Sequence, residues 1–405
     1  MGIVSSKPKI DSKLKFVTSF LHNPKFKENK TILAIWLVTA AITVIAKLII
    51  GKFNNYKIFE GVYNHAIHGL TLYGPYPEEY GDVNLYGIIF SFIISPFAIL
   101  PQWLGMILWV MANTALLFYA IQQLPLSKNQ KAIICWTAYI ELITAQLVQQ
   151  FNISVAAFIL LAFAFIEKKK DFWAAFVILL GTFVKIYSIV GLAFFFFSKH
   201  KIKFLLSCLF WTILLFIFPI PFFGLEYTMS QYQDWFIAIT EKNSHNMFAI
   251  SQNVSLLGLV RRVSGNPDYS DLWLIVPGLI LFFIPYLRIR QYKSLSFRFL
   301  LLANVLLFTV LFSSGSEASS YVTAMLGVGI WYVNSPASNK KLNYWLLILT
   351  IIVVAISTTE LTPPFFRRAI VHPYVVKSWF CILVWLKICY EMIFLTFDQK
   401  SLNHD

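Results

Sequence analysis

Long apolar runs alternate with short polar segments along almost the whole chain. Eleven runs of 14 to 26 residues are dominated by aliphatic and aromatic side chains. They cover residues 31–50, 103–122, 131–148, 152–167, 172–197, 203–223, 271–287, 298–313, 321–334, 343–360 and 377–396. A helix of roughly 20 apolar residues crosses a bilayer core. The pattern therefore predicts an all-α polytopic membrane protein with about 11 to 12 membrane crossings and no sizeable soluble domain.

The composition excludes the water-soluble classes. Of 405 residues, 58% are hydrophobic, 17% are aromatic and 13% are charged, and the mean hydropathy is +0.68. The formal net charge is +14, but the basic residues gather in short loops beside the apolar runs. That distribution is typical of the cytosolic loops of membrane proteins and not of a nucleic-acid interface. We therefore expect the bilayer as a partner and no nucleic acid.

One further apolar run, 85–100, decides the topology. If it crosses the membrane, the basic loops at 128–131 and 168–170 lie opposite the lysine-rich N-terminus, against the usual charge bias. If it stays at the outer surface as a shallow or re-entrant helix, every strongly basic loop is cytosolic, provided that 172–197 forms two half-length helices. Pro96 favours this second arrangement because proline weakens a helix. A tilted crossing is the alternative.

The favoured topology places both termini in the cytosol, and we expect the membrane to be a bacterial plasma membrane. Residues 1–30 form a basic cytosolic tail, 31–396 form one transmembrane domain, and 397–405 form a short tail. The outer segments are 51–102, with its interfacial or re-entrant helices, 224–270 and 361–376. Many acidic residues fall on the outer side, namely Glu60, Glu78, Glu79, Asp82, Glu226, Asp234, Glu241, Asp268, Asp271, Glu317 and Glu360. Any chemistry is therefore expected outside.

The first outer segment carries the candidates for a catalytic base. In the stretch TLYGPYPEEYGD, residues 71–82, two prolines exclude a helix, and the carboxylates stand in a turn rich in tyrosine and glycine. A carboxylate at a membrane interface is a plausible proton acceptor near neutral pH, because partial burial disfavours its charged form. We rank Asp82 first, then Glu79, then Glu60. A solvated acidic loop is the alternative.

The same segment offers candidates for binding a sugar. Residues 54–68 predict an amphipathic helix at the membrane surface, with His65 and His68 three positions apart. No third ligand is fixed by the spacing, so we expect hydrogen bonding by His65 and no metal. Asn152, in a polar turn between two apolar runs, is a further sugar-binding candidate, although a plain interhelix turn accounts for it. No cofactor is predicted, and no pattern indicates a divalent cation.

Lys185 lies in the middle of the apolar run 172–197. A lysine at the centre of a bilayer costs at least about 2.5 kcal/mol on insertion scales. If the chain turns near Lys185, the ammonium group reaches the outer face, where it can bind an anion such as a lipid phosphate. Snorkelling of the side chain to the interface is the alternative.

Paired arginines supply further candidate ligands for a phosphate. Arg261 and Arg262 end the stretch SQNVSLLGLVRR, in which Gln252 and Asn253 offer hydrogen bonds to sugar hydroxyls. Arg368 belongs to a second outer pair. A guanidinium group binds phosphate through two parallel hydrogen bonds. Anionic lipid headgroups account for either pair alone, but two pairs on the side of the acidic segment favour a phosphate-containing ligand.

Several stretches, taken in order, resemble the GT-C superfamily of integral membrane glycosyltransferases, specifically the polyprenyl-phosphate-mannose-dependent enzymes of glycosyltransferase family 87. These stretches are NNYKIFEGVYNHAIHG, LYGPYPEEYGDVNLYG, SPFAILPQWLGMILW, QQFN, GTFVKIYSIVGL, SQNVSLLGLVRR and SSGSEASSYVTAMLGVGIWY. Their order and spacing, and no single motif, carry the resemblance. It implies a GT-C-like helix bundle with a large first outer loop. It also implies transfer of a hexose, mannose in these enzymes, from a polyprenyl-phosphate sugar to a lipid or glycan acceptor.

The resemblance further implies an inverting reaction. An acidic residue of the first outer loop deprotonates the acceptor hydroxyl, and basic groups, here Lys185, Arg261 and Arg262, hold the departing phosphate. The chain departs from the family at one point: related enzymes commonly carry an aspartate soon after the first span, where this sequence has Asn54 and Asn55. An amide cannot act as a base. Either a later carboxylate takes the role, or this copy is inactive.

Two other functions fit the crossing pattern. A transporter or flippase for a lipid-linked saccharide predicts polar groups deep in several spans, and apart from Glu141, Lys185 and Glu391 such groups are sparse. A saccharide ligase or polymerase retains outer arginine pairs but requires no carboxylate base in the first outer loop.

Overall fold

The computed structural model describes residues 24–246, 252–266, 269–336, 340–359 and 362–397. Helices make up 79% of the structure, and the described ranges contain no strand, which confirms the predicted all-α class. The elements are η1 (Pro24–Lys27), α2 (Asn29–Ile50), α3 (Asn54–Ile67), α4 (Phe90–Ala98), α5 (Gln102–Gln123), α6 (Lys128–Val148), α7 (Asn152–Glu167), α8 (Asp171–Val184), η2 (Ile186–Phe197), α9 (Lys201–Ile217), α10 (Ile220–Phe223), α11 (Leu225–Asn246), α12 (Leu256–Ser264), α13 (Leu272–Phe283), η3 (Ile284–Leu287), η4 (Ile289–Lys293), α14 (Leu295–Leu311), η5 (Ala318–Ser320), α15 (Tyr321–Asn334), α16 (Lys340–Ser357), α17 (Pro364–Phe366), η7 (Arg367–Val371) and α18 (Val376–Phe394).

Several of these helices have the length and composition of membrane spans. Among the described residues, five segments are long and apolar enough to cross a membrane: α2, α5, α6, the continuous segment Lys201–Phe223, and α16. The bent pair Pro364–Val371 and Val376–Phe394 makes a sixth if it is one span. Further apolar helices, among them α7 and α14, are shorter. The chain is therefore an integral membrane protein with several spans.

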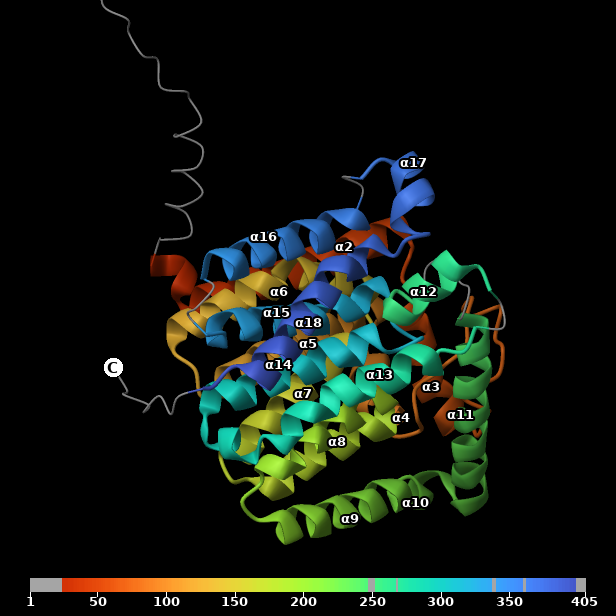
Figure 1. Ribbon diagram of the computed structural model, residues 1–405. Coiled ribbons are helices and arrows are strands. Elements are labelled where there is room, and N and C mark those ends of the chain that lie inside the picture. The colour runs from red at the N-terminus through yellow and green to blue at the C-terminus, as the bar shows by residue number, and fades with distance from the viewer. Residues whose placement is uncertain (1–23, 247–251, 267–268, 337–339, 360–361, 398–405) are drawn as a thin grey trace, which may run out of the picture.

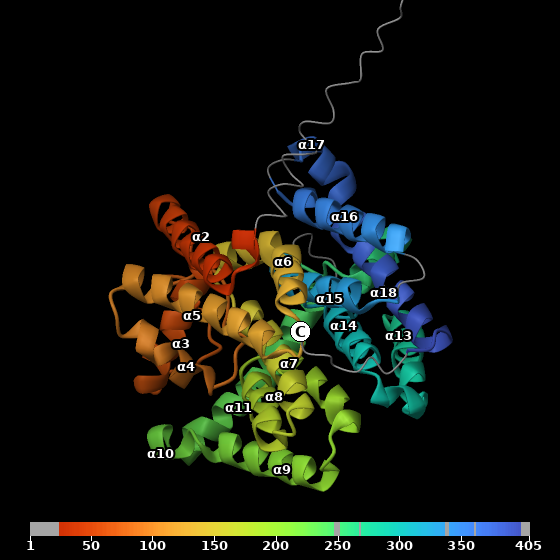
Figure 2. The ribbon, with the colours of Figure 1, turned by 90° about the vertical axis from the view of Figure 1, so that its left-hand side faces the viewer.

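The long helices lie side by side in one bundle (Figures 1 and 2). α11 runs across them at one end, where α3, α4, α12 and α17 also gather. We call this end the loop end. The opposite end carries the lysine-rich and arginine-rich turns at 168–170, 199–203 and 288–293, and we call it the basic end. The first described helix begins and α18 ends at the basic end.

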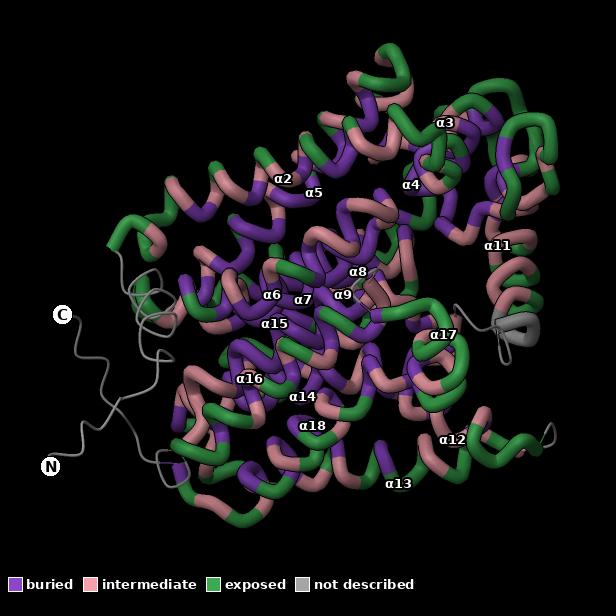
Figure 3. Tube along the Cα trace, turned by 90° about the horizontal axis from the view of Figure 1, so that it is seen from above, coloured by how far each residue is buried: buried purple, intermediate pink, exposed green. Residues whose placement is uncertain are grey.

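The core of the bundle consists of α7, α14 and α15. Nearly every side chain of α7 and α15 is buried, and each of these helices packs against several others. In Figure 3 they lie in the buried centre, whereas α2 lies at the edge with one exposed face. Large apolar side chains such as Ile49 of α2 and Leu206 of α9 are exposed. In a membrane protein, such a surface faces lipid.

A helical hairpin replaces a full crossing between residues 171 and 198. α8 and η2 pack against each other, and Ser198 Oγ donates a hydrogen bond of 2.6 Å to Asp171 Oδ1 where the two arms meet at the basic end. Gly181 permits the close approach of the arms, because a Cβ atom there would lie 2.3 Å from Ser188 Oγ. The predicted turn near Lys185 is therefore present, at the loop end.

The apolar run 85–100 forms only the nine-residue helix α4. Such a helix reaches about 14 Å, less than half of a bilayer core. It contains Pro96 and packs against α3 and α5. The Gly87 amide just before it donates a hydrogen bond of 3.1 Å to the carbonyl of Val184 at the hairpin tip. The first loop is thus joined to the hairpin at the loop end.

Candidate functional site

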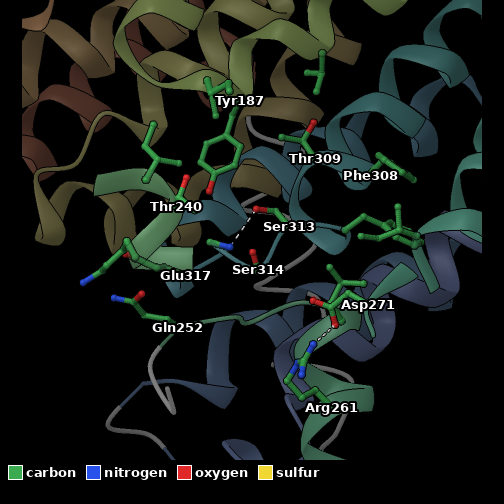
Figure 4. Close-up of a pocket in the computed structure, with 18 of the residues that line it drawn as sticks. Tyr187, Thr240, Gln252, Arg261, Asp271, Phe308, Thr309, Ser313, Ser314 and Glu317 are labelled. Atoms are coloured by element: carbon green, nitrogen blue, oxygen red, sulfur yellow. Dashed lines mark hydrogen bonds and ion pairs between the residues drawn. The ribbon is translucent and has the colours of Figure 1, made fainter. Parts of the chain in front are cut away.

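A cavity with a volume of about 830 Å³ opens at the loop end. The hairpin tip, α11, α12, α13, the end of α14 and the segment 313–317 contribute its walls (Figure 4). Its charged lining residues are Lys185, Lys242, Arg261, Asp271 and Glu317. Segments far apart in the sequence therefore bring both signs of charge into one space.

Lys185 and Glu317 are joined by a chain of side-chain hydrogen bonds. Lys185 Nζ donates to Asn152 Oδ1 at 2.7 Å, and Asn152 Nδ2 donates to Gln150 Oε1 at 2.8 Å. Gln150 Nε2 then donates to Glu317 Oε2 at 2.9 Å. Ser319 Oγ also accepts from Asn152 at 2.9 Å. The turn between α6 and α7 thus fixes the positions of a cation and a carboxylate relative to each other.

Local sequence explains why Glu317 is held in place. The SSGSE segment ends the apolar helix α14 and leads into η5, and Glu317 is the N-terminal cap of η5. Its side chain accepts a hydrogen bond from the Ser320 amide, and the Ser320 hydroxyl accepts one of 3.2 Å from the Glu317 amide. A carboxylate offers about four acceptor positions. Two neutral donors orient Glu317 and leave acceptor capacity that faces the cavity.

The ammonium group of Lys185 is surrounded by aromatic rings. It lies 5.4 Å from the ring centre of Tyr86 and 5.6 Å from that of Tyr187. Cation–π contacts stabilise a partly desolvated ammonium group. Gly315 allows the Tyr187 ring to come close, because a Cβ atom there would lie 2.1 Å from the phenolic oxygen. The cation therefore has ring contacts and one amide oxygen as partners, and no carboxylate within ion-pair distance among the described residues.

Arg261 and Asp271 form an ion pair on the opposite wall, with 2.8 Å between Nη2 and Oδ1 (Figure 4). Arg261 lies in the last turn of α12 and is buried, and Asp271 directly precedes α13. The guanidinium carbon also lies 5.6 Å from the centre of the Tyr269 ring. The pair ties α12 to α13 and brings one guanidinium group to the cavity wall.

The three predicted bases of the first loop lie outside this lining. Glu79 is half-exposed, and its Oε2 lies 3.1 Å from Nε2 of the buried His65. Glu60 accepts a hydrogen bond of 2.6 Å from Gln102, and burial raises the pKa of Glu60 above its ordinary value. Asp82 lies 3.1 Å from Nζ of Lys242, which does line the cavity. Of these three carboxylates, Asp82 is the one whose ion-pair partner, Lys242, lines the cavity.

Asn54 and Asn55, at the start of α3, have structural contacts. Asn54 Oδ1 accepts a hydrogen bond of 2.8 Å from the Gly81 amide, and Asn55 Nδ2 donates one of 2.8 Å to the carbonyl of Val148. The second bond requires a donor, and an ionised aspartate has none. Asn55 therefore connects the start of α3 to the end of α6 in a way that the acid cannot.

The other predicted binding residues divide into two groups. Gln252 lines the cavity, and its buried Oε1 has no hydrogen-bond partner among the described residues. Asn253 is buried beside it and accepts a hydrogen bond of 2.7 Å from Ser255. Arg262 donates to the carbonyl oxygens of His372 and Gln252, each at 2.6 Å, and is absent from the lining. Arg368 is exposed and lies outside the cavity.

Sequence reasoning missed Glu317, Asp271 and Lys242 as site residues. The sequence places Glu317 and Asp271 only among the acidic residues of the outer side. The available signal was the position of Glu317 after the Ser-Gly turn that ends a long apolar run, in a stretch that already contributed to the family resemblance. Nothing in the sequence shows that Gln150, 167 positions earlier, holds it.

Two carboxylates inside the apolar helices have structural partners. Glu141 of α6 lies 2.8 Å from Lys377 of α18, and both side chains are almost fully buried. Glu391 lies 3.0 Å from Lys387 and accepts a hydrogen bond of 3.0 Å from Trp331. Buried charges require such partners. These contacts connect helices and account for the charges without a catalytic role.

A comparison with known families identifies a match over the middle of the chain. The model of glycosyltransferase family 87 matches residues 84–314, which is more than half of the chain. The matched region includes Lys185, Arg261 and Asp271, begins after Asp82, and ends three residues before Glu317. No curated protein matches the chain.

Proposed function

We propose a donor, a reaction and a set of catalytic residues for this chain, which belongs to glycosyltransferase family 87 and is therefore a membrane glycosyltransferase. In this proposal the protein moves a hexose, mannose being our first choice, from a polyprenyl-phosphate sugar to a hydroxyl group of a lipid or glycan acceptor. The reaction takes place in the cavity at the loop end. The observation that carries the proposal is the hydrogen-bonded chain from Lys185 to Glu317 on the wall of one cavity.

Glu317 is the general base in this reaction. The acceptor oxygen attacks the anomeric carbon while its proton moves to the carboxylate of Glu317. The bond between the anomeric carbon and the phosphate oxygen breaks, and the phosphate leaves with the electron pair. Because this is a single displacement, the anomeric configuration inverts. Asp271 is a weaker candidate because Arg261 already neutralises it at 2.8 Å.

Lys185 holds the departing phosphate. Charge develops on the phosphate oxygen as the glycosidic bond breaks, and a fixed cation stabilises that charge. The contacts with Asn152, Tyr86 and Tyr187 fix the ammonium group before substrate binds. Arg261 of α12, one of the two other cations in the lining, is the second proposed phosphate ligand. Gln252 Oε1, which has no hydrogen-bond partner in the part of the chain that the structure describes, accepts a hydrogen bond from a sugar hydroxyl in this proposal.

The cavity also suits a donor with a lipid tail. Part of its wall is apolar and consists of Ile186, Val190, Ile275, Phe308 and Phe312, which come from η2, α13 and α14. These elements carry exposed apolar residues on their outer faces, such as Ile280 of α13. A polyprenyl chain can therefore remain in the bilayer while its phosphate enters the polar part of the cavity.

The proposed orientation follows from charge. The basic end carries the turns at 168–170, 199–203 and 288–293, and cytosolic loops of membrane proteins are enriched in lysine and arginine. We therefore place the basic end in the cytosol and the loop end outside, in a bacterial plasma membrane.

Sealed membrane vesicles that contain the protein test the reaction. With radiolabelled polyprenyl-phosphate mannose we expect a labelled glycolipid or glycan, formed with inverted anomeric configuration. Vesicles without the protein are the control. Movement of the intact labelled donor across the membrane without a new glycosidic bond would instead identify a flippase and contradict the proposal.

A further inference from the structure

A second cavity lies at the loop end and has a volume of about 370 Å³. It is lined by the end of α2, the start of α3 and the end of α6, and it shares no lining residue with the cavity of Glu317. Three of its lining residues are Lys47, Lys52 and Lys57. None of its lining residues is acidic. The cavity therefore gathers three positive charges without a negative one.

The three lysines form no ion pair with any described residue. The ammonium group of Lys57 lies 5.4 Å from the centre of the Phe53 ring. Lys57 also interacts electrostatically with Glu60, whose pKa it lowers, but Glu60 is not part of the cavity lining. Like charges that share one concave surface repel each other, and bound anions relieve that repulsion. Lysines are common in the cytosolic loops of membrane proteins. These three lie instead at the loop end, where the candidate site also lies, so this enrichment does not account for them.

The backbone shows why the lysines converge. Gly51 has a φ of 70° and ends α2, so that the amide of Lys52 donates a hydrogen bond of 3.1 Å to the carbonyl of Lys47. This turn brings Lys52 back beside the last turn of α2. α3 begins at Asn54, which places Lys57 in its first turn. Three lysines separated by five positions each thus surround one concavity.

Carbonyl groups that would repel an anion are already engaged. α6 ends at this cavity, and its last carbonyls carry partial negative charge. Asn55 donates to the carbonyl of Val148 at 2.8 Å, and the side-chain amide of Gln149 donates to that of Leu147. The start of α3 lies on the same cavity, and its cap residue, Phe53, offers no side-chain acceptor. The electrostatic surroundings therefore favour an anion.

We propose that this lysine cavity binds a phosphate group. Its proposed ligand is a phosphate monoester or diester, whose source is either the headgroup of an anionic lipid or phosphate in solution. The exposed apolar side chains of Ile49 and Ile50 stand next to the cavity at the end of α2. Such residues place the cavity where lipid tails and headgroups meet, which favours the lipid source. The site requires no sugar donor and does not depend on the proposed transfer reaction.

Native mass spectrometry of the full-length protein in detergent tests the proposal, with phosphatidic acid added as the probe. The test variant is the triple substitution Lys47→Gln, Lys52→Gln and Lys57→Gln. A matched control removes the same charge at the basic end through Lys199→Gln, Lys201→Gln and Lys203→Gln. At about 1 kcal/mol per lysine, we expect roughly 100-fold weaker binding of phosphatidic acid in the test variant and unchanged binding in the control.

A third variant guards against misfolding. Arginine at the same three positions keeps the charge and the phosphate contacts, so it should retain binding within about threefold. Inorganic phosphate at millimolar concentration separates the two sources: displacement of the lipid supports a site that also accepts free phosphate, and persistence of the lipid supports a headgroup site. Undiminished binding in the test variant, or equal loss in the test and control variants, would overturn the proposal. Transfer activity plays no part in this readout.

Discussion

The carboxylate of Glu317 and those of Glu79 and Asp82 all lie in connecting segments at the loop end, but their surroundings differ. Glu317 lies on the wall of a cavity, receives hydrogen bonds from neutral donors, and is connected through Gln150 and Asn152 to a cation. Glu79 and Asp82 have side chains that are 50% and 46% exposed, and each lies against its own basic partner. Proton transfer from the hydroxyl group of a bound acceptor to a carboxylate requires the first kind of surroundings.

The difference arises from the elements that hold each group. Glu317 stands in the short connection between α14 and α15, two of the most buried helices. Glu79 and Asp82 stand in an irregular segment between α3 and α4, at the periphery of the bundle. A carboxylate at the end of core helices has neighbours that helix packing fixes. An acidic side chain in an exposed turn instead forms an ion pair with a nearby surface cation. The general base is therefore expected at the end of a core helix.

The largest expected effect comes from removing the proposed base. Glu317→Gln should reduce the rate of sugar transfer by roughly 10²- to 10⁴-fold, because it removes the proton acceptor and keeps the shape of the side chain. The measurement is the initial rate of label transfer in vesicles, with protein amount and thermal stability compared between variants. Glu79→Gln is the matched control and should retain the rate within about twofold. A large loss of rate in Glu79→Gln, together with a nearly unchanged rate in Glu317→Gln, would show that the base lies in the first loop.

Loss of the proposed phosphate ligand should have the next largest effect. Lys185→Gln removes a charge-assisted hydrogen bond to the donor, worth about 1.5–3 kcal/mol, so kcat/KM for the donor should fall roughly 10- to 100-fold. Lys185→Arg should recover part of this loss. Unchanged kinetics in Lys185→Gln would remove Lys185 from the site.

The ion pair between Arg261 and Asp271 is expected to contribute to the stability of the fold. Arg261→Gln leaves the carboxylate of Asp271 partly buried without its charged partner, which should lower the free energy of unfolding by about 2–3 kcal/mol. Thermal unfolding in detergent measures this change. Arg368→Gln, at an exposed position, is the control and should leave the melting temperature unchanged. Equal melting temperatures for both variants would show that the pair adds nothing to stability.

The smallest effect is expected in the first loop. Asp82→Asn removes an exposed ion pair with Lys242, and such pairs contribute about 0–1 kcal/mol. Transfer should therefore stay within about threefold of the unmodified protein, measured under the same vesicle conditions. A loss of more than 100-fold would show that Asp82, reached through Lys242, takes part in the chemistry.

The sequence predicted the helices and named three residues that line the cavity, Lys185, Gln252 and Arg261. Apolar runs locate the helices because a bilayer requires long apolar segments, and a lysine in the middle of such a run requires a turn, which the structure has at Lys185. The surroundings of Glu317 could not be predicted, because Gln150 reaches Glu317, and Asn152 reaches Ser319, only when α6, α7, α14 and α15 pack together. Ion pairs between Asp82 and Lys242 depend on α11 crossing the bundle end, which no local pattern reveals.

A structure of the protein with a bound polyprenyl-phosphate sugar tests the central claim most directly. The account predicts that the phosphate lies beside the Lys185 ammonium group and that the anomeric carbon faces the carboxylate of Glu317, within the cavity of about 830 Å³. A sugar phosphate bound against Glu79 or Asp82 in the first loop, with Glu317 remote from the anomeric carbon, would contradict it.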